Sequence, residues 1–269
     1  MNGSVEPDQL VQKAFAGKPL DHCLVIDAHG HLSENPNVPL PDTSLETLIA
    51  RMDRMGIDVF CCSAIAAVYN QARFGNDQVI AAVQRYPDRI FGYMCADVGY
   101  PLRVLPELER CLAAGLRGVK IYSHSIHLGF EYENTVFTPV FEFAEAHALP
   151  LLAHTFSVKE LGDLEQRFER YPHVRFIMAH TGSCGATSYV RLAKSYSNVY
   201  IETCLSICPR GLFETLVAEG VTDKVLWGTD AYFMDASQQL GRVVFAQIPE
   251  DAKRRILGQN AARVLGIQR

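Results

Sequence analysis

The sequence predicts an α/β protein that forms a single (β/α)8 TIM barrel. Eight short apolar runs recur along the 269 residues, segments of helical period separate them, and no linker rich in Pro, Gly or Ser divides the chain. Such a barrel uses about 250 residues. We therefore expect one domain over 1–269 with a core of about 24–267. A doubly wound open sheet is the alternative, but no glycine-rich phosphate-binding fingerprint follows the first run.

The eight runs are continuous and apolar. That pattern suits strands buried on both faces, as the strands of parallel sheets are. The predicted strands cover 24–29, 57–62, 90–95, 118–122, 150–154, 174–180, 198–202 and 225–230.

The segments between the runs repeat their apolar residues at helical spacing. In 43–55 this pattern begins at Thr43 or Ser44, which suit an N-cap, and stops at Gly56. We expect 1–22 to cover the floor of the barrel. The other predicted helices cover 77–86, 101–114, 136–148, 158–171, 189–196 and 209–218, with an extra C-terminal helix over 249–266.

Composition narrows the class of protein. Hydrophobic residues make up 48% and charged residues 20%, which excludes intrinsic disorder. The net charge is −5 without a basic stripe, so neither nucleic acid nor an anionic membrane is an expected partner. No apolar run reaches the length of about 18 residues that spans a membrane. The N-terminus lacks the pattern of a secretory signal and no CxxC occurs among the eight cysteines. We therefore expect a cytoplasmic protein with mostly buried thiols.

Polar residues end the predicted strands on the side where barrel enzymes carry their active sites. His29 and His31 lie two apart on the first strand and point to the same side, which suits Zn²⁺ or another divalent metal. His154, His180 and Asp230 end the fifth, sixth and eighth strands. A carboxylate beside imidazoles is a candidate metal ligand that can also accept a proton. We expect these residues to form the catalytic site.

Three further residues are candidates for substrate binding. Lys120 and Tyr122 lie on the fourth predicted strand, and Arg73 follows the second. Arg73 could hold a carboxylate by a bidentate contact, and a surface arginine is the alternative. Glu202, near the end of the seventh strand, is equally well a structural acid.

Two other pairs are expected to bind no metal. His124 and His127 lie in a predicted loop, where contact with substrate or solvent is the expectation. Cys204 and Cys208 are four apart, a spacing that fits neither a zinc knuckle nor a redox pair, so we expect structural thiols.

The order of these motifs resembles the amidohydrolase superfamily. The resemblance is closer to the amidohydrolase-related branch, which includes aminocarboxymuconate-semialdehyde decarboxylase and many uncharacterised metal-dependent hydrolases. It covers roughly 24–267. The segments that carry it are 26–31 (IDAHGH), 115–121 (GLRGVKI), 149–154 (LPLLAH), 176–182 (FIMAHTG), 225–230 (VLWGTD) and 260–265 (NAARVL).

The resemblance implies one or two divalent metals in a distorted barrel. By analogy His29, His31, His154 and Asp230 would bind a single ion, expected to be zinc, and His180 would act as a base or polarising group. In binuclear members a carboxylated lysine on the fourth strand bridges two metals, and Lys120 is the candidate for that role here. The alternative is an unmodified Lys120 that holds a substrate carboxylate. The chain departs from many relatives after Asp230 and in the loop 123–133.

Three functions compete on this sequence. The first is a hydrolase that uses metal-activated water on an ester, lactone or amide of a small molecule. The second is a non-oxidative decarboxylase of a small unsaturated or aromatic acid, in which the metal and a cationic side chain hold the substrate. The third is a barrel that only binds a ligand. We place hydrolysis first, and leave the oligomeric state open with a homodimer as one option.

Overall fold

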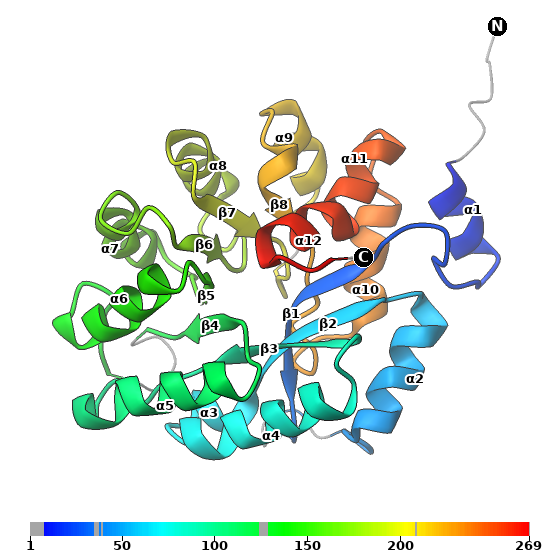
Figure 1. The fold of residues 1–269 in the computed structure, drawn as a ribbon. Helices are drawn as coiled ribbons and strands as arrows, with labels where there is room; N and C mark the ends of the chain where they lie inside the picture. Colours follow the sequence, from blue (N-terminus) through cyan, green and yellow to red (C-terminus); the bar gives the residue numbers. More distant parts are fainter. Residues whose placement is uncertain (1–7, 35–37, 39, 124–128, 208, 269) are drawn as a thin grey trace, which may run out of the picture.

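The computed structural model describes residues 8–34, 38, 40–123, 129–207 and 209–268, and it forms an eight-stranded parallel barrel (Figure 1). The strands are neighbours in chain order, so the predicted fold is confirmed. They are β1 (Ile26–Leu32), β2 (Val59–Ala64), β3 (Ile90–Met94), β4 (Gly118–Ile121), β5 (Pro150–Ala153), β6 (Arg175–Met178), β7 (Val199–Glu202) and β8 (Val225–Leu226).

The seam between β8 and β1 is irregular. β8 has only two residues, and the chain beyond it pairs with β1 instead. The Ala28 amide donates to the Trp227 carbonyl at 2.9 Å, and the Asp230 amide donates to the His29 carbonyl at 2.8 Å. This pairing nearly closes the barrel, whose distortion the family resemblance implies, and it brings Asp230 against the first strand.

Helices alternate with the strands around the outside of the barrel (Figure 1). At the start of α2 the Ser44 hydroxyl accepts from the Thr47 amide, and the helix ends at Gly56 in a left-handed conformation, as expected. The helices that match predictions are α2 (Leu45–Met55), α4 (Ala72–Arg85), α5 (Pro101–Ala113), α6 (Thr138–Ala146), α7 (Val158–Phe168), α8 (Ala186–Ser195) and α9 (Leu212–Ala218). The predicted C-terminal helix is α11 (Glu250–Arg254), a π-helical stretch over Arg255–Gln259, and α12 (Asn260–Leu265). Helices α1 (Gln9–Phe15), α3 (Ile65–Val68) and α10 (Ala236–Val244) were not predicted.

The floor of the barrel is covered by α12. Ala261, Val264 and Leu265 join a buried cluster with inward-facing strand residues such as Ile26 and Leu226. In Figure 1, α12 lies across the front of the barrel while α1 lies at its side, beside α10. The prediction that 1–22 forms the floor is therefore wrong for its described part, because α12 already buries the inner apolar residues there.

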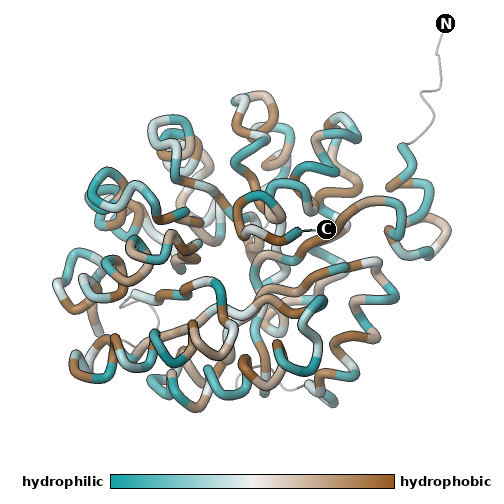
Figure 2. The backbone as a smooth tube through the Cα atoms, viewed as in Figure 1, coloured by the Kyte–Doolittle hydropathy of each residue, from teal (hydrophilic) through white to brown (hydrophobic). Residues whose placement is uncertain are grey.

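Hydropathy follows this architecture. Figure 2 shows mainly hydrophobic residues along β2, whereas the surrounding helices alternate hydrophobic and hydrophilic residues. Each helix thus buries one face against the barrel. Every helix within the described ranges is too short or too polar to traverse a bilayer.

Candidate active site

His29, His31 and Asp230 converge at the seam between β1 and β8. Asp230 Oδ1 lies 3.1 Å from His31 Nε2 and 3.6 Å from His29 Nε2. Atoms held by one ion at about 2.0–2.1 Å are about 3.0–3.4 Å apart. Asp230 has a φ of +56°, a conformation unfavourable for a residue with a Cβ, and the hydrogen bonds to β1 hold it there. The donor types and spacing of these three side chains fit a divalent metal.

His154 and His180 form a second pair across the site. His154 Nδ1 lies 3.0 Å from His180 Nε2, and the two rings meet edge to face. His154 stands outside the three-residue group whose ligand atoms lie within 4.8 Å of one another. His180 also has a positive φ, +62°. The structure thus brings all five predicted site residues to one region, with His31, His154, His180 and Asp230 lining one cavity.

That cavity has a volume of about 300 Å³ and aromatic walls. Phe156 stacks on His154 with an interplanar angle of 10°, and Phe233 meets the His31 ring nearly at right angles. The volume lies at the lower end of the range for small-molecule sites. The cavity therefore suits a small, flat molecule.

Lys120 is buried beside the metal-ligand candidates. Its Nζ lies 2.9 Å from His29 Nε2 and 5.0 Å from the centre of the Tyr122 ring. Tyr122 lines the cavity, and its hydroxyl shares a hydrogen bond with Ser63 at 3.0 Å, next to His31 Nδ1. Both predicted substrate-binding residues of the fourth strand thus lie at the site.

Arg73 lies elsewhere. Its guanidinium is paired with Glu107 on α5 at 3.1 Å, its side chain is 70% exposed, and it is not among the residues that line the cavity. The structure therefore does not bring Arg73 together with the other predicted site residues, because the helix that carries it turns its side chain to α5.

Burial controls the charges of the site. It lowers the pKa of His180 to about 4 and also lowers the pKa values of His29, His31 and His154. Burial alone would raise the pKa of Asp230, but the hydrogen bond with His31 and the neighbouring His180 and Lys120 leave this pKa below its usual value. Near pH 7 the site therefore offers neutral imidazoles and a carboxylate, which are the forms that bind metals.

Three residues that contact this site lie outside the predicted set of site residues: Cys204, which we expected to be a structural thiol, Glu202, for which a structural acid was an equal alternative, and Asp27, which was given no role. Glu202 Oε2 lies 2.9 Å from His29 Nδ1, and Cys204 Sγ lies 3.1 Å from the same nitrogen. Asp27, whose pKa is raised to about 7 by burial, accepts hydrogen bonds from Thr229 across the seam. Glu202 ends β7 and Asp27 lies two residues before His29 on β1, and an acid inside an otherwise apolar predicted strand was the available signal. His124, His127 and Cys208 lie outside the described residues.

Comparison with known proteins identifies the family. The family model described as amidohydrolase matches residues 26–267. The chain belongs to the amidohydrolase family. This confirms the predicted resemblance and the coarser part of the functional prediction, an amidohydrolase-type barrel enzyme.

Individual relatives of this chain are distant in sequence. A 2-amino-3-carboxymuconate-6-semialdehyde decarboxylase from Caenorhabditis elegans is 26% identical over 141 residues, which are 41% of this chain and 35% of that protein. The chain thus matches about a third of the curated relative's length. Among solved structures, 5-carboxyvanillate decarboxylase from Sphingomonas paucimobilis superimposes with a TM-score of 0.72 at 20% identity, covering 91% of this chain and 100% of that one. A manganese-bound dihydroxybenzoic acid decarboxylase from Polaromonas sp. gives 0.74 at 18% identity, covering 92% and 97%. At these identities the structures show a shared fold.

Proposed function

We propose that this protein is a metal-dependent, non-oxidative decarboxylase of a small unsaturated or aromatic acid. The observation that carries the proposal is a buried cation beside the ligand group: Lys120 is 2% exposed, and its Nζ lies 2.9 Å from His29 Nε2. A decarboxylase must hold an anionic substrate, and a buried anion needs a paired cation. The sequence placed hydrolysis first, but the decarboxylase relative supports the second reading better.

The proposed roles follow from the geometry. His29, His31 and Asp230 would hold a divalent ion, with His154 as the proposed fourth ligand. When bound, the ion would supply a Lewis acid that polarises an oxygen of the substrate. Lys120 would pair with the substrate's carboxylate, and Tyr122 would contact the substrate from the wall of the cavity.

His180 is the proposed proton carrier. Its Nδ1 donates to the Cys204 carbonyl at 3.0 Å, so its Nε2 is the nitrogen that exchanges protons. A neutral imidazole there can take a proton and pass it to the carbon that loses carbon dioxide. The reaction R–CO₂⁻ + H⁺ → R–H + CO₂ balances without an oxidant or reductant. The flat walls made by Phe156 and Phe233 suit a planar carbon skeleton.

Hydrolysis is the second candidate, and the position of Asp230 favours it. Its carboxylate lies within the ligand group, where it could accept a proton from water that attacks an ester, lactone or amide. The further predictions of one zinc ion, and of a homodimer as one option, stay predictions.

A matched substrate panel tests the proposal. Metal-free protein is reloaded with Mn²⁺ or Zn²⁺ in separate samples and given hydroxybenzoic and unsaturated dicarboxylic acids, with carbon dioxide measured. The methyl esters and lactones of the same skeletons are assayed for hydrolysis. Metal-dependent release of carbon dioxide is the expected result. Hydrolysis of esters or lactones without carbon dioxide would favour the hydrolase instead, and binding without turnover would favour the ligand-binding barrel.

A further inference from the structure

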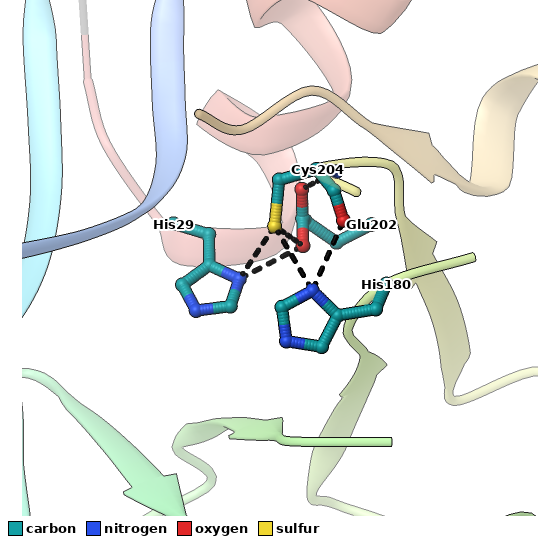
Figure 3. Close-up of side chains that lie close together, drawn as sticks. All are labelled: His29, His180, Glu202 and Cys204. Atoms are coloured by element: carbon teal, nitrogen blue, oxygen red, sulfur yellow. Dashed lines mark hydrogen bonds and ion pairs between the residues drawn. The ribbon is translucent and has the colours of Figure 1, made fainter. Parts of the chain in front are cut away.

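The end of β7 lies against two of the site histidines. Figure 3 shows Nδ1 of His29 and Nδ1 of His180 turned toward Glu202 and Cys204, with the other ring nitrogens turned away. Glu202 Oε2 lies 2.9 Å from His29 Nδ1, and the Cys204 carbonyl oxygen lies 3.0 Å from His180 Nδ1. Glu202 and Cys204 are completely buried. Water therefore does not compete for these contacts.

These contacts decide which nitrogen of each ring carries the proton. A carboxylate and a carbonyl oxygen only accept hydrogen bonds, so each Nδ1 must donate, and the lone pair of each neutral ring is left on Nε2. In His29 this lone pair faces the ligand group, because Nε2 is the atom 3.6 Å from Asp230 Oδ1. Both oxygens of Glu202 accept hydrogen bonds from Cys204, Oε1 from its backbone amide and Oε2 from its thiol, so the group is held in an acceptor position against His29.

The same four residues do not have the spacing of a second metal site. Cys204 Sγ lies 3.1 Å from His29 Nδ1 and 3.0 Å from Glu202 Oε2. Sulfur and nitrogen bound to one tetrahedral zinc ion at about 2.3 and 2.0–2.1 Å would be about 3.5 Å apart. The shorter contacts fit hydrogen bonds, so the cluster supports the histidines without a metal of its own.

Close approach of the chain after β8 keeps Glu202 in place. A Cβ on Gly228 would lie 2.5 Å from Glu202 Oε1 and 2.8 Å from His29 Cβ. Only glycine leaves room for this approach. Glu202 is thus confined between the Cys204 amide, His29 and the backbone at Gly228.

We propose that Glu202 is a positioning residue that holds His29 in its Nδ1–H form and so presents Nε2 to the divalent ion. This inference rests on the metal-binding part of the proposed function and is independent of the reaction catalysed. A carboxylate behind a ligating histidine orients the ring and increases its basicity, and loss of such a partner typically weakens metal binding 10- to 100-fold.

The substitution Glu202→Gln tests it with almost no change in size. The amide oxygen must accept from the fixed Cys204 amide, so the NH₂ group faces His29 Nδ1 and forces the ring proton onto Nε2. We expect the Kd for Mn²⁺ or Zn²⁺, measured on metal-free protein by competition with a chelator, to rise about 10- to 100-fold. An unchanged Kd in folded protein would overturn the proposal.

Glu107→Gln is the matched control, because Glu107 is a buried glutamate that pairs with Arg73 and Arg110 away from the cavity. It should lower stability yet leave the Kd within about twofold of the wild type, since distant sites act independently. An equal loss of metal affinity in this control would assign the effect of Glu202→Gln to general destabilisation and contradict the proposal.

Two further measurements remain informative if Glu202→Gln fails to fold. The ¹⁵N spectra of histidine-labelled wild-type protein should show His29 protonated at Nδ1 in the metal-free and metal-loaded states, and a proton on Nε2 would overturn the proposal. Cys204→Ala should keep one metal equivalent per chain. A fall from two equivalents to one would make the cluster a metal site and contradict the inference.

Discussion

Lys120 Nζ and His29 Nε2 lie 2.9 Å apart inside the barrel, and this is the same nitrogen that faces Asp230. The amine and a divalent ion therefore compete for one lone pair. Burial lowers the pKa of Lys120, although the Asp230 carboxylate partly offsets this. The contact links metal binding to substrate binding. An ion that binds His29 Nε2 displaces the Lys120 amine from this nitrogen, and the same amine is proposed to hold the substrate's carboxylate.

Replacing Lys120 should therefore have opposite effects on the binding of the metal ion and on the turnover of an acidic substrate. Lys120→Met removes the competitor for His29 Nε2, so metal affinity should stay equal or rise. The same change should lower kcat/KM for an acidic substrate by at least about 10-fold, through loss of one charge-assisted hydrogen bond. Calorimetry with Mn²⁺ and steady-state kinetics check the two effects. Loss of one of two metal equivalents would show instead that Lys120 is a bridging ligand.

His180→Ala should keep the metal and lose most of the activity. The ring is proposed to move a proton and is not assigned as a ligand, so the rate should fall on the order of 10²- to 10⁴-fold. Metal content by elemental analysis and kcat with the wild-type substrate are the two readouts. If metal and activity disappear together, His180 is a ligand and the proton must be carried by another group.

Asp230→Ala should abolish tight metal binding. The substitution removes the carboxylate that contacts both histidines of β1. The Kd for the metal should therefore rise by more than the roughly 100-fold expected when a residue that only supports a ligating histidine, such as Glu202, is replaced. Chelator competition measures this. A variant that still binds one equivalent at wild-type affinity would place the metal elsewhere.

Glu107 should make stability depend on pH. Burial alone would raise its pKa, but hydrogen bonds from Arg110, Asn76 and Cys111 lower it below the usual value. A carboxyl group whose pKa is lowered in the folded state stabilises the protein at pH values above its unfolded pKa of about 4.3. This stabilisation is lost as the pH falls from there through the folded-state pKa. Glu107→Gln should cost about 1–3 kcal/mol at pH 7, measured by urea unfolding. That difference should shrink below about pH 4, and a difference that grows in acid would contradict the assignment.

Most of the barrel could be predicted because its strands are continuous apolar runs. All eight predicted strands are present, and each predicted helix overlaps an observed one. Helix α10 was missed because it follows an irregular stretch, 227–235, whose pairing with β1 depends on distant residues. The floor of the barrel was assigned to residues 1–22 when α12 covers it. The spacing of apolar residues shows that a helix buries one face, but it does not show which other element that face packs against.

The site was predictable to the extent that it lies at strand ends. His29, His31 and Asp230 meet because the barrel closes between β1 and β8, which the strand order implies. Arg73 could not be placed, since the direction of a helix after a loop decides whether its side chain reaches the cavity. The role of Glu202 depends on one 2.9 Å contact with the far nitrogen of His29, which no sequence spacing encodes.

Anomalous diffraction from crystals of the Mn²⁺-loaded protein, recorded on both sides of the manganese edge, tests the central claim most directly. A single peak about 2.0–2.3 Å from His29 Nε2, His31 Nε2 and Asp230 Oδ1 is the predicted result. A peak among His29 Nδ1, His180 Nδ1, Glu202 and Cys204, or no peak near β1 in protein saturated with Mn²⁺, would contradict it.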